Sequence, residues 1–209
     1  EKRAAKDAAA GRLRSRQRSK RFWFEKHRWA MLSGGHLLIG GKDAKGNDVV
    51  VRKHLSSNDL YFHADLHGAP SCSLKLKDGL APNQNPSEAI PDGVASLQIV
   101  QNLAEGVEDA RELPESLHAE AAQVAVCWSR AWGSGGAAAT AFHARPSQVS
   151  KTTETGESLG RGSFVVRGQR NWHRDLSLEL AIGMAVVNGV PMPVSGTPAT
   201  ISENFERWG

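Results

Sequence analysis

The chain has 209 residues, of which 40% are hydrophobic and 23% are charged. This composition is ordinary for a soluble globular protein, with room for one domain and short appendages. No apolar run approaches the roughly 18 residues that a membrane-spanning helix needs, so we expect no transmembrane segment and no membrane partner. The two cysteines, Cys72 and Cys127, are too few for a disulfide framework. We expect both to be reduced and buried in a cytoplasmic protein.

The positive charge is concentrated at the start of the chain. Residues 1–30 contain eleven Lys and Arg against three Asp and Glu, whereas the whole chain has a net charge of only +4. The body that follows is therefore acidic on balance. Residues 1–21 predict a basic helical arm that ends an upstream coiled coil, and such an arm can attract the phosphates of a nucleic acid. A solvated arm without a ligand would carry the same charge.

Short β-patterned runs, divided by Gly and Asn turns, fill the first half of the chain. The predicted strands cover residues 29–33, 36–39, 49–54, 60–64 and 71–76. Because such short links join antiparallel neighbours, these strands predict a β-meander.

The middle of the chain changes character. It begins with a Pro-rich loop at residues 78–91, followed by a short predicted helix at residues 94–104. The strongest helical pattern covers residues 115–132, where apolar residues recur at spacings of three and four. Trp128 and Trp132 belong to its apolar face, so we expect both in the core.

Three more strands are predicted, at residues 138–144, 163–168 and 176–182. The tail from Asn188 shows no periodicity. The fold class is therefore α+β: a largely antiparallel β-meander packed on a central helix, with a basic N-terminal helical arm.

The run HADLHGA brings His63, Asp65 and His67 to a corner that ends in glycine. Alternate residues of an extended segment project to one face, as metal ligands often do. A metal site would need a further ligand after folding. Three other histidines could supply it: His36, His54 and His143. Contact with RNA and a structural hydrogen-bond network are the other interpretations, and these residues alone leave all three open.

A second candidate surface lies later in the chain and consists of Lys151, Arg161, Arg167, Arg170 and Trp172. It combines cationic donors with an aromatic ring that can stack on an unpaired base. A solvated strand edge guarded by basic residues would have a similar composition.

Seven ordered blocks of the sequence resemble the NFACT-R domain, the RNA-binding module of ribosome quality control factors that include the nuclear export mediator factor family. The blocks cover residues 23–29, 40–54, 63–69, 127–132, 148–151, 155–159 and 162–172. Among them are the WFEKHRW run, a Gly-Gly-Lys-Asp-Ala turn, the basic Arg52-Lys53-His54 segment and HADLHGA without a gap. The resemblance places the domain at residues 22–187, with an insertion near residues 84–112 and a C-terminal tail at residues 188–209.

The resemblance implies a module that binds RNA and catalyses no reaction, with no cofactor and no metal. Its expected partners are the ribosome, through large-subunit RNA or tRNA, and the upstream domains of the same full-length protein. Such a factor acts in the rescue of stalled translation and in tailing of the nascent chain. The expected RNA-binding residues are Arg52, Lys53, His54, His63, Asp65, His67, Gly68, Lys151, Arg161, Arg167, Arg170 and Trp172.

Two other functions stay open at this point. A metal-dependent hydrolase or nuclease could use His63, Asp65 and His67, although the chain has no carboxylate cluster with the spacing that two-metal chemistry needs. A scaffold that docks the coiled coil would need no ligand site.

Overall fold

The computed structural model of the chain describes residues 20–85, 90–91, 93–133 and 138–208. The predicted basic arm at residues 1–21 lies almost wholly outside this part. The strands are β1 (Arg28–Met31), β2 (His36–Gly40), β3 (Leu60–Ala64), β4 (Cys72–Pro82), β5 (Ala95–Val100), β6 (Ala138–Ala144), β7 (Val149–Ser150), β8 (Val165–Val166), β9 (Asn171–Ser177), β10 (Ala181–Val187) and β11 (Val190–Gly196). The α-helices are α2 (Ala44–Val49), α3 (Glu115–Cys127) and α4 (Pro198–Trp208). The short helical turns are η1 (Trp23–Lys26), η2 (Ser33–Gly35), η3 (Val50–His54), η4 (Ala110–Glu112), η5 (Ala131–Gly133) and η6 (Pro146–Gln148).

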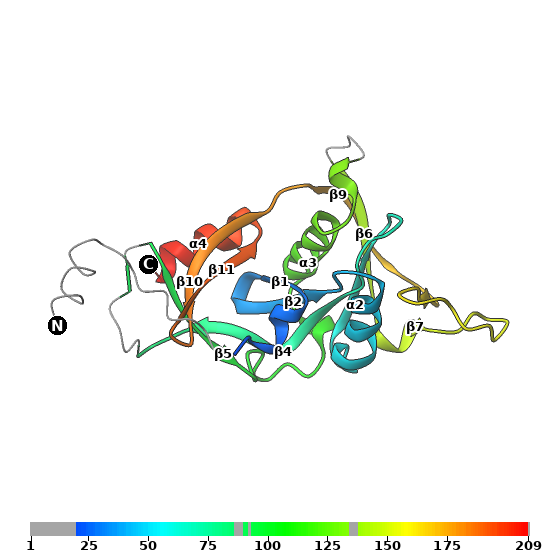
Figure 1. Cartoon of the computed structure of the whole chain (residues 1–209), viewed down its shortest axis with the longest axis horizontal. Helices are drawn as coiled ribbons and strands as arrows, with labels where there is room; N and C mark the ends of the chain where they lie inside the picture. Colours follow the sequence, from blue (N-terminus) through cyan, green and yellow to red (C-terminus); the bar gives the residue numbers. More distant parts are fainter. Residues whose placement is uncertain (1–19, 86–89, 92, 134–137, 209) are drawn as a thin grey trace.

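One large sheet organises the described chain, with the strand order β11-β10-β5-β4-β3-β6-β9 (Figure 1). Strand β2 pairs with β4 and with β1. The pairing of β5 with β10 is parallel, and the other named neighbours run antiparallel. The α+β class and the largely antiparallel sheet are thus confirmed. The simple meander is wrong, because β4 lies between β2 and β3.

The first of two large apolar cores lies among β1, β2, β4, β5, β10 and β11, beside α4. Strand β11 returns to β1, where the Ser195 hydroxyl donates to the Trp29 carbonyl at 2.9 Å. The buried side chains of this core include Phe24, Ile39, Leu80, Leu97 and Val187.

The second large core lies between α3 and the strands β3, β4 and β6. Its buried side chains include Phe62, Leu74, Ala121 and Val124. The carboxylate of Glu120 in α3 joins the two cores, since it accepts hydrogen bonds from the Ser33 N–H at 2.9 Å and from the Thr200 hydroxyl.

Residues 49–54 are helical, which corrects the strand predicted there. The Asp43 carboxylate caps α2 by accepting from the Gly46 N–H at 2.6 Å. The Asn47 side chain then accepts from the Ser71 N–H at 3.0 Å. These two contacts outweigh the β propensity of the valine run, and α2 continues into the single turn η3, where Val50 is buried.

Residues 95–100 form strand β5, which corrects the helix predicted at residues 94–104. Ala95 and Leu97 belong to the first core, and Gln98, the next residue of the strand, is exposed. Strand β4 also continues to Pro82, so the predicted loop starts later than residue 78.

Helix α3 ends at Cys127 and not at residue 132. The Ser129 hydroxyl donates to the Val126 carbonyl at 2.6 Å and accepts from the Ala131 N–H at 3.1 Å, which turns the chain away. Trp132 is 56% exposed, so its predicted place in the core is wrong. Its indole N–H donates to the Cys127 carbonyl at 2.7 Å and satisfies the helix end.

The C-terminal part also differs from its prediction. Only Val165–Val166 of residues 163–168 form a strand, and residues 176–182 span the end of β9 and the start of β10. The tail holds β11 and α4. Pro191 and Pro193 are exposed in β11, where an edge strand tolerates a missing N–H.

Both cysteines are free and buried, as predicted. Among the described helices, none combines the length and the apolar composition that crossing a bilayer requires.

Candidate nucleic-acid interface

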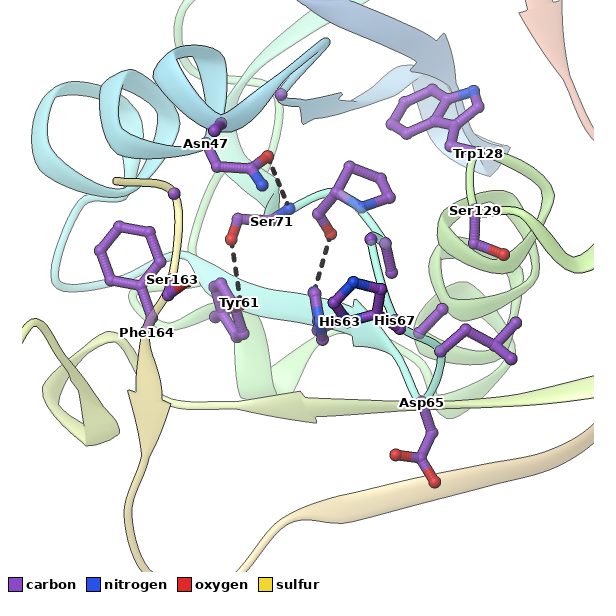
Figure 2. A pocket seen from close by; sticks show the side chains of 18 of the residues that line it. Asn47, Tyr61, His63, Asp65, His67, Ser71, Trp128, Ser129, Ser163 and Phe164 are labelled. Atoms are coloured by element: carbon purple, nitrogen blue, oxygen red, sulfur yellow. Dashed lines mark hydrogen bonds between the residues drawn. The ribbon is translucent and has the colours of Figure 1, made fainter. Parts of the chain in front are cut away.

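A cleft of about 1090 Å³ opens beside the corner that follows β3 (Figure 2). Four segments supply most of its lining: the start of α2, the corner at residues 64–71, the chain just after α3, and the loop that leads into β8. In Figure 2, Phe164 lies on one side and Trp128 on the other, with His63 and His67 between them. The HADLHGA corner therefore forms the middle of the cleft.

Cations outnumber carboxylates in this lining. The cations are Arg28, Lys42, Arg130, Arg161 and Arg170, and the carboxylates are Asp43 and Asp65. Within the part of the chain that the structure describes, the guanidinium groups of Arg28, Arg130 and Arg161 donate no hydrogen bond to protein, and all three residues are exposed. The cleft thus offers unsatisfied donors to an anion.

His63 forms the inner wall of the corner. Its Nδ1–H donates to the Pro70 carbonyl at 3.0 Å, and its ring stacks against Tyr61 at 6.2 Å between centroids. Burial lowers the pKa of His63, so the ring is neutral at pH 7. The fixed tautomer leaves Nε2 as a hydrogen-bond acceptor.

Asp65 and His67 lie on the exposed turn beyond the end of β3. Asp65 points away from His63 in Figure 2, and the ring N–H of His63 donates to the Pro70 carbonyl and not to this carboxylate. The expected alternation on one strand face is therefore wrong, because the strand ends at Ala64. Gly68 follows with φ 77°, beside the Arg130 guanidinium.

The three histidines considered as further metal ligands are engaged elsewhere. His36 Nδ1 lies 3.3 Å from the Lys75 carbonyl, His54 stacks on Trp23, and His143 is hydrogen-bonded to His173 at 2.8 Å. No group of three or more His, Cys, Asp or Glu that could hold a metal ion occurs among the described residues.

Lys151 fixes the loop that carries Arg161 and Phe164. Its Nζ donates to the Asp48 carboxylate at 2.8 Å and to the Gly160 carbonyl at 2.7 Å, and it lies 4.5 Å from the centre of the Phe164 ring. The hydrogen bond from Lys151 holds the pKa of the Asp48 carboxyl below its usual range. We expected Lys151 to contact RNA, but its donors here serve the protein.

Gly162 brings the same loop close to α2. Its φ is 77°, and a Cβ on it would lie 2.6 Å from the Ala44 Cα. Its N–H donates to the Asp48 carboxylate at 3.1 Å. Any larger residue would push the loop away from α2.

An aromatic and cationic group continues beyond the cleft onto β9. The Arg170 guanidinium lies 4.8 Å from the centre of the Phe142 ring, and Phe142 contacts Trp172 at 5.2 Å. Trp172 is 40% exposed and has Arg174 at 5.9 Å. Trp172 therefore lies next to the cleft without lining it.

The remaining predicted residues lie elsewhere. Arg52 and Lys53 are exposed on η3, and His54 packs at its end against Trp23. The Arg167 guanidinium donates to the Thr152 carbonyl at 2.8 Å. None of these lines the cleft.

The structure thus brings together one half of the predicted set: His63, Asp65, His67, Gly68, Arg161 and Arg170. Four lining residues were missed: Arg28, Lys42, Arg130 and Phe164. All four fall within blocks of the family resemblance, which was the signal that could have found them.

The model of the NFACT protein RNA-binding domain matches residues 20–168, most of the chain. The chain belongs to this family. The domain is 31% identical over 196 residues to the archaeal Rqc2 homolog aRqcH of Methanocaldococcus jannaschii, covering 94% of this chain and 24% of the relative. It is 37% identical over 151 residues to the ribosome quality control complex subunit NEMF of Homo sapiens, covering 72% of this chain and 11% of that protein.

Among solved structures, the C-terminal part of the fibronectin/fibrinogen-binding protein of Streptococcus suis matches with a TM-score of 0.46 and 17% identity, over 83% of this chain and 55% of that one. The chain spans about a quarter or less of the curated relatives named above.

Proposed function

We propose that this NFACT domain is the RNA-binding module of a cytoplasmic ribosome quality control factor, and that it binds large-subunit RNA or tRNA through the cleft. The observation that carries the proposal is a set of three exposed guanidinium groups that line one concave surface and donate to no acceptor in the described part of the chain: Arg28, Arg130 and Arg161. The module itself catalyses no reaction. The names of the relatives, an Rqc2 homolog and a ribosome quality control subunit, support the cellular context.

The physical basis is the attraction of a phosphate backbone to fixed cations. Each phosphate that a Lys or Arg neutralises releases counterions, so affinity falls as salt rises. Guanidinium groups also bind phosphate through two parallel hydrogen bonds, which fixes the orientation of the RNA. Arg52 and Lys53 add long-range attraction from outside the cleft. Rescue of stalled translation and nascent-chain tailing belong to the full-length factor in this proposal.

A salt titration with RNA tests the proposal. The double variant Arg130→Gln/Arg161→Gln should bind RNA more weakly and with a salt slope smaller by about 2, one for each lost phosphate contact. Lys77→Gln is the control, because Lys77 is exposed on β4 outside the cleft. A double variant with the affinity and slope of the wild type would contradict the proposal. Competition between tRNA and large-subunit RNA for the same protein then identifies the preferred partner.

A further inference from the structure

The shape of the cleft restricts which RNA can use it. Its volume of about 1090 Å³ is close to the upper end of small-ligand pockets. A paired helix is far wider than such a space, because it presents two backbones around stacked base pairs. Unpaired nucleotides can enter the cleft, whereas a duplex can only rest on its rim.

The two sides of the cleft offer matching chemistry. The loop before β8 carries Arg161 and Phe164, and the chain after α3 carries Trp128 and Arg130, so each side has one ring and one guanidinium. Figure 2 shows the two rings on opposite sides of the corner. A nucleotide between them would meet an aromatic face for its base and a cation for the phosphates on either side.

Phe164 is the ring best placed for stacking. Its one face lies under the Lys151 ammonium at 4.5 Å, and it lines the cleft. Lys151 is in turn held by Asp48 and by the Gly160 and Ser163 carbonyls, so the ring is positioned before any ligand arrives. A positioned ring costs less entropy on binding than a mobile one.

We infer that the cleft is a receptor for unpaired RNA nucleotides, with a base stacked on Phe164 and the flanking phosphates bound by Arg161 and Arg130. This inference rests on the proposed function and narrows it from RNA in general to single-stranded segments, such as loops and ends. The neutral His63, with Nε2 as an acceptor, adds a site for an exocyclic amino group or a ribose hydroxyl.

Binding of a short single-stranded RNA and of its blunt duplex, at one salt concentration, tests the inference. The wild-type chain should prefer the single strand. Phe164→Leu should weaken binding of the single strand about tenfold, as expected for the loss of one stacked base, and should leave duplex binding unchanged. Trp132→Leu is the matched control, because Trp132 is exposed and lies outside the cleft lining.

A fluorescent base separates stacking from a change in the loop. RNA that contains 2-aminopurine should lose fluorescence on binding to the wild type and to Trp132→Leu, and should keep it with Phe164→Leu. Equal affinity for single strand and duplex, or no effect of Phe164→Leu on affinity and fluorescence, would overturn the inference. If the inference failed in this way but RNA binding still depended on Arg130 and Arg161, the proposed function would stand. A wild-type chain that binds neither the single strand nor the duplex would overturn the inference and the proposed function together.

Discussion

Two lysines hold two parts of this domain in the same way but at different depths. Lys75 Nζ donates to the Asp59 carboxylate at 2.6 Å and to the His54 carbonyl at 2.7 Å, below η3. Lys151 Nζ donates to the Asp48 carboxylate at 2.8 Å and to two carbonyls of the cleft loop. The side chains of the first pair are 7% and 4% exposed, and those of the second pair are 20% and 22% exposed.

The deeper Lys75 pair and the shallower Lys151 pair should have different roles, one in the stability of the fold and the other in positioning the cleft loop. Asp59 also accepts from the Leu76 N–H at 3.0 Å and the Ser56 N–H at 2.8 Å, so its carboxylate is fully engaged inside the protein. Without Lys75, the buried Asp59 carboxylate would lower the free energy of unfolding, because its charge would have no cation beside it. Without Lys151, water could still solvate the partly exposed Asp48 carboxylate. We therefore expect the Lys75 pair to control unfolding and the Lys151 pair to control the cleft.

The largest effect should come from the deeper pair. Lys75→Met should lower the free energy of unfolding by about 3–5 kcal/mol, because it leaves the Asp59 carboxylate buried without a cation. Chemical denaturation measures this loss. Lys77→Met is the control on the same strand, and its exposed side chain should change stability by no more than about 0.5 kcal/mol. Similar stabilities for the two variants would show that the depth of the Lys75 pair is unimportant.

Acid should act on buried histidines whose pKa lies below the usual value of 6.5. Burial lowers the pKa of His143 and of His27 from 6.5 to about 4, assisted by His118 and His54 respectively. Between pH 6.5 and about pH 4, each of these histidines binds more protons in the unfolded chain than in the folded chain. These two histidines therefore leave the free energy of unfolding unchanged above pH 6.5. As the pH falls from 6.5 toward about 4, each lowers that free energy by up to about 1.4 kcal/mol per pH unit.

Urea denaturation at a series of pH values measures this slope. His143→Gln should unfold with a shallower dependence on pH than the wild type, because one of the histidines with a lowered pKa no longer titrates. A slope that His143→Gln leaves unchanged would assign the effect to other groups.

The shallower pair provides a test of whether Lys151 positions the loop or binds phosphate. Asp48→Asn keeps an acceptor for the Gly162 N–H but removes the charged partner of Lys151. If Lys151 positions Arg161 and Phe164, the variant should bind RNA more weakly although the protein is more positive. If Lys151 binds phosphate directly, freeing it should strengthen binding. Stability should fall by about 1 kcal/mol or less, as for other partly exposed ion pairs.

The sequence predicts those parts of the fold that depend on neighbouring residues. Strand β3 and the start of α3 were found because turn and proline signals flank them. Residues 49–54 were missed because three valines favour a strand, while the contacts that make them helical involve Asp43 and the distant Ser71. Residues 95–100 pair on one side with β4 and on the other with β10, and β10 lies more than eighty residues later, so the local sequence does not show that this segment is an inner strand.

The candidate site shows the same difference between residues that are close in sequence and residues that only the fold brings together. The HADLHGA corner was found because its residues are contiguous. Arg161 was predicted as part of a separate surface, and Arg28 and Arg130 were missed; the three come from distant segments, and only the fold brings them to one cleft. The role of Lys151 depends on Asp48, more than a hundred residues earlier, and local sequence therefore cannot show that its donors are already used.

The smallest effect on RNA binding should come from Arg52 and Lys53, the cations of η3, whose last carbonyl accepts from Lys75 of the deeper pair. Arg52 and Lys53 are exposed on η3, outside the lining of the cleft. Arg52→Gln/Lys53→Gln should weaken single-stranded and duplex RNA equally and only a few-fold, with a smaller salt slope, because charge without shape attracts any phosphate backbone. Filter binding of both RNAs across salt measures this. A selective loss of single-strand binding would place recognition on η3, since only a surface that contacts the unpaired bases can distinguish the two RNAs.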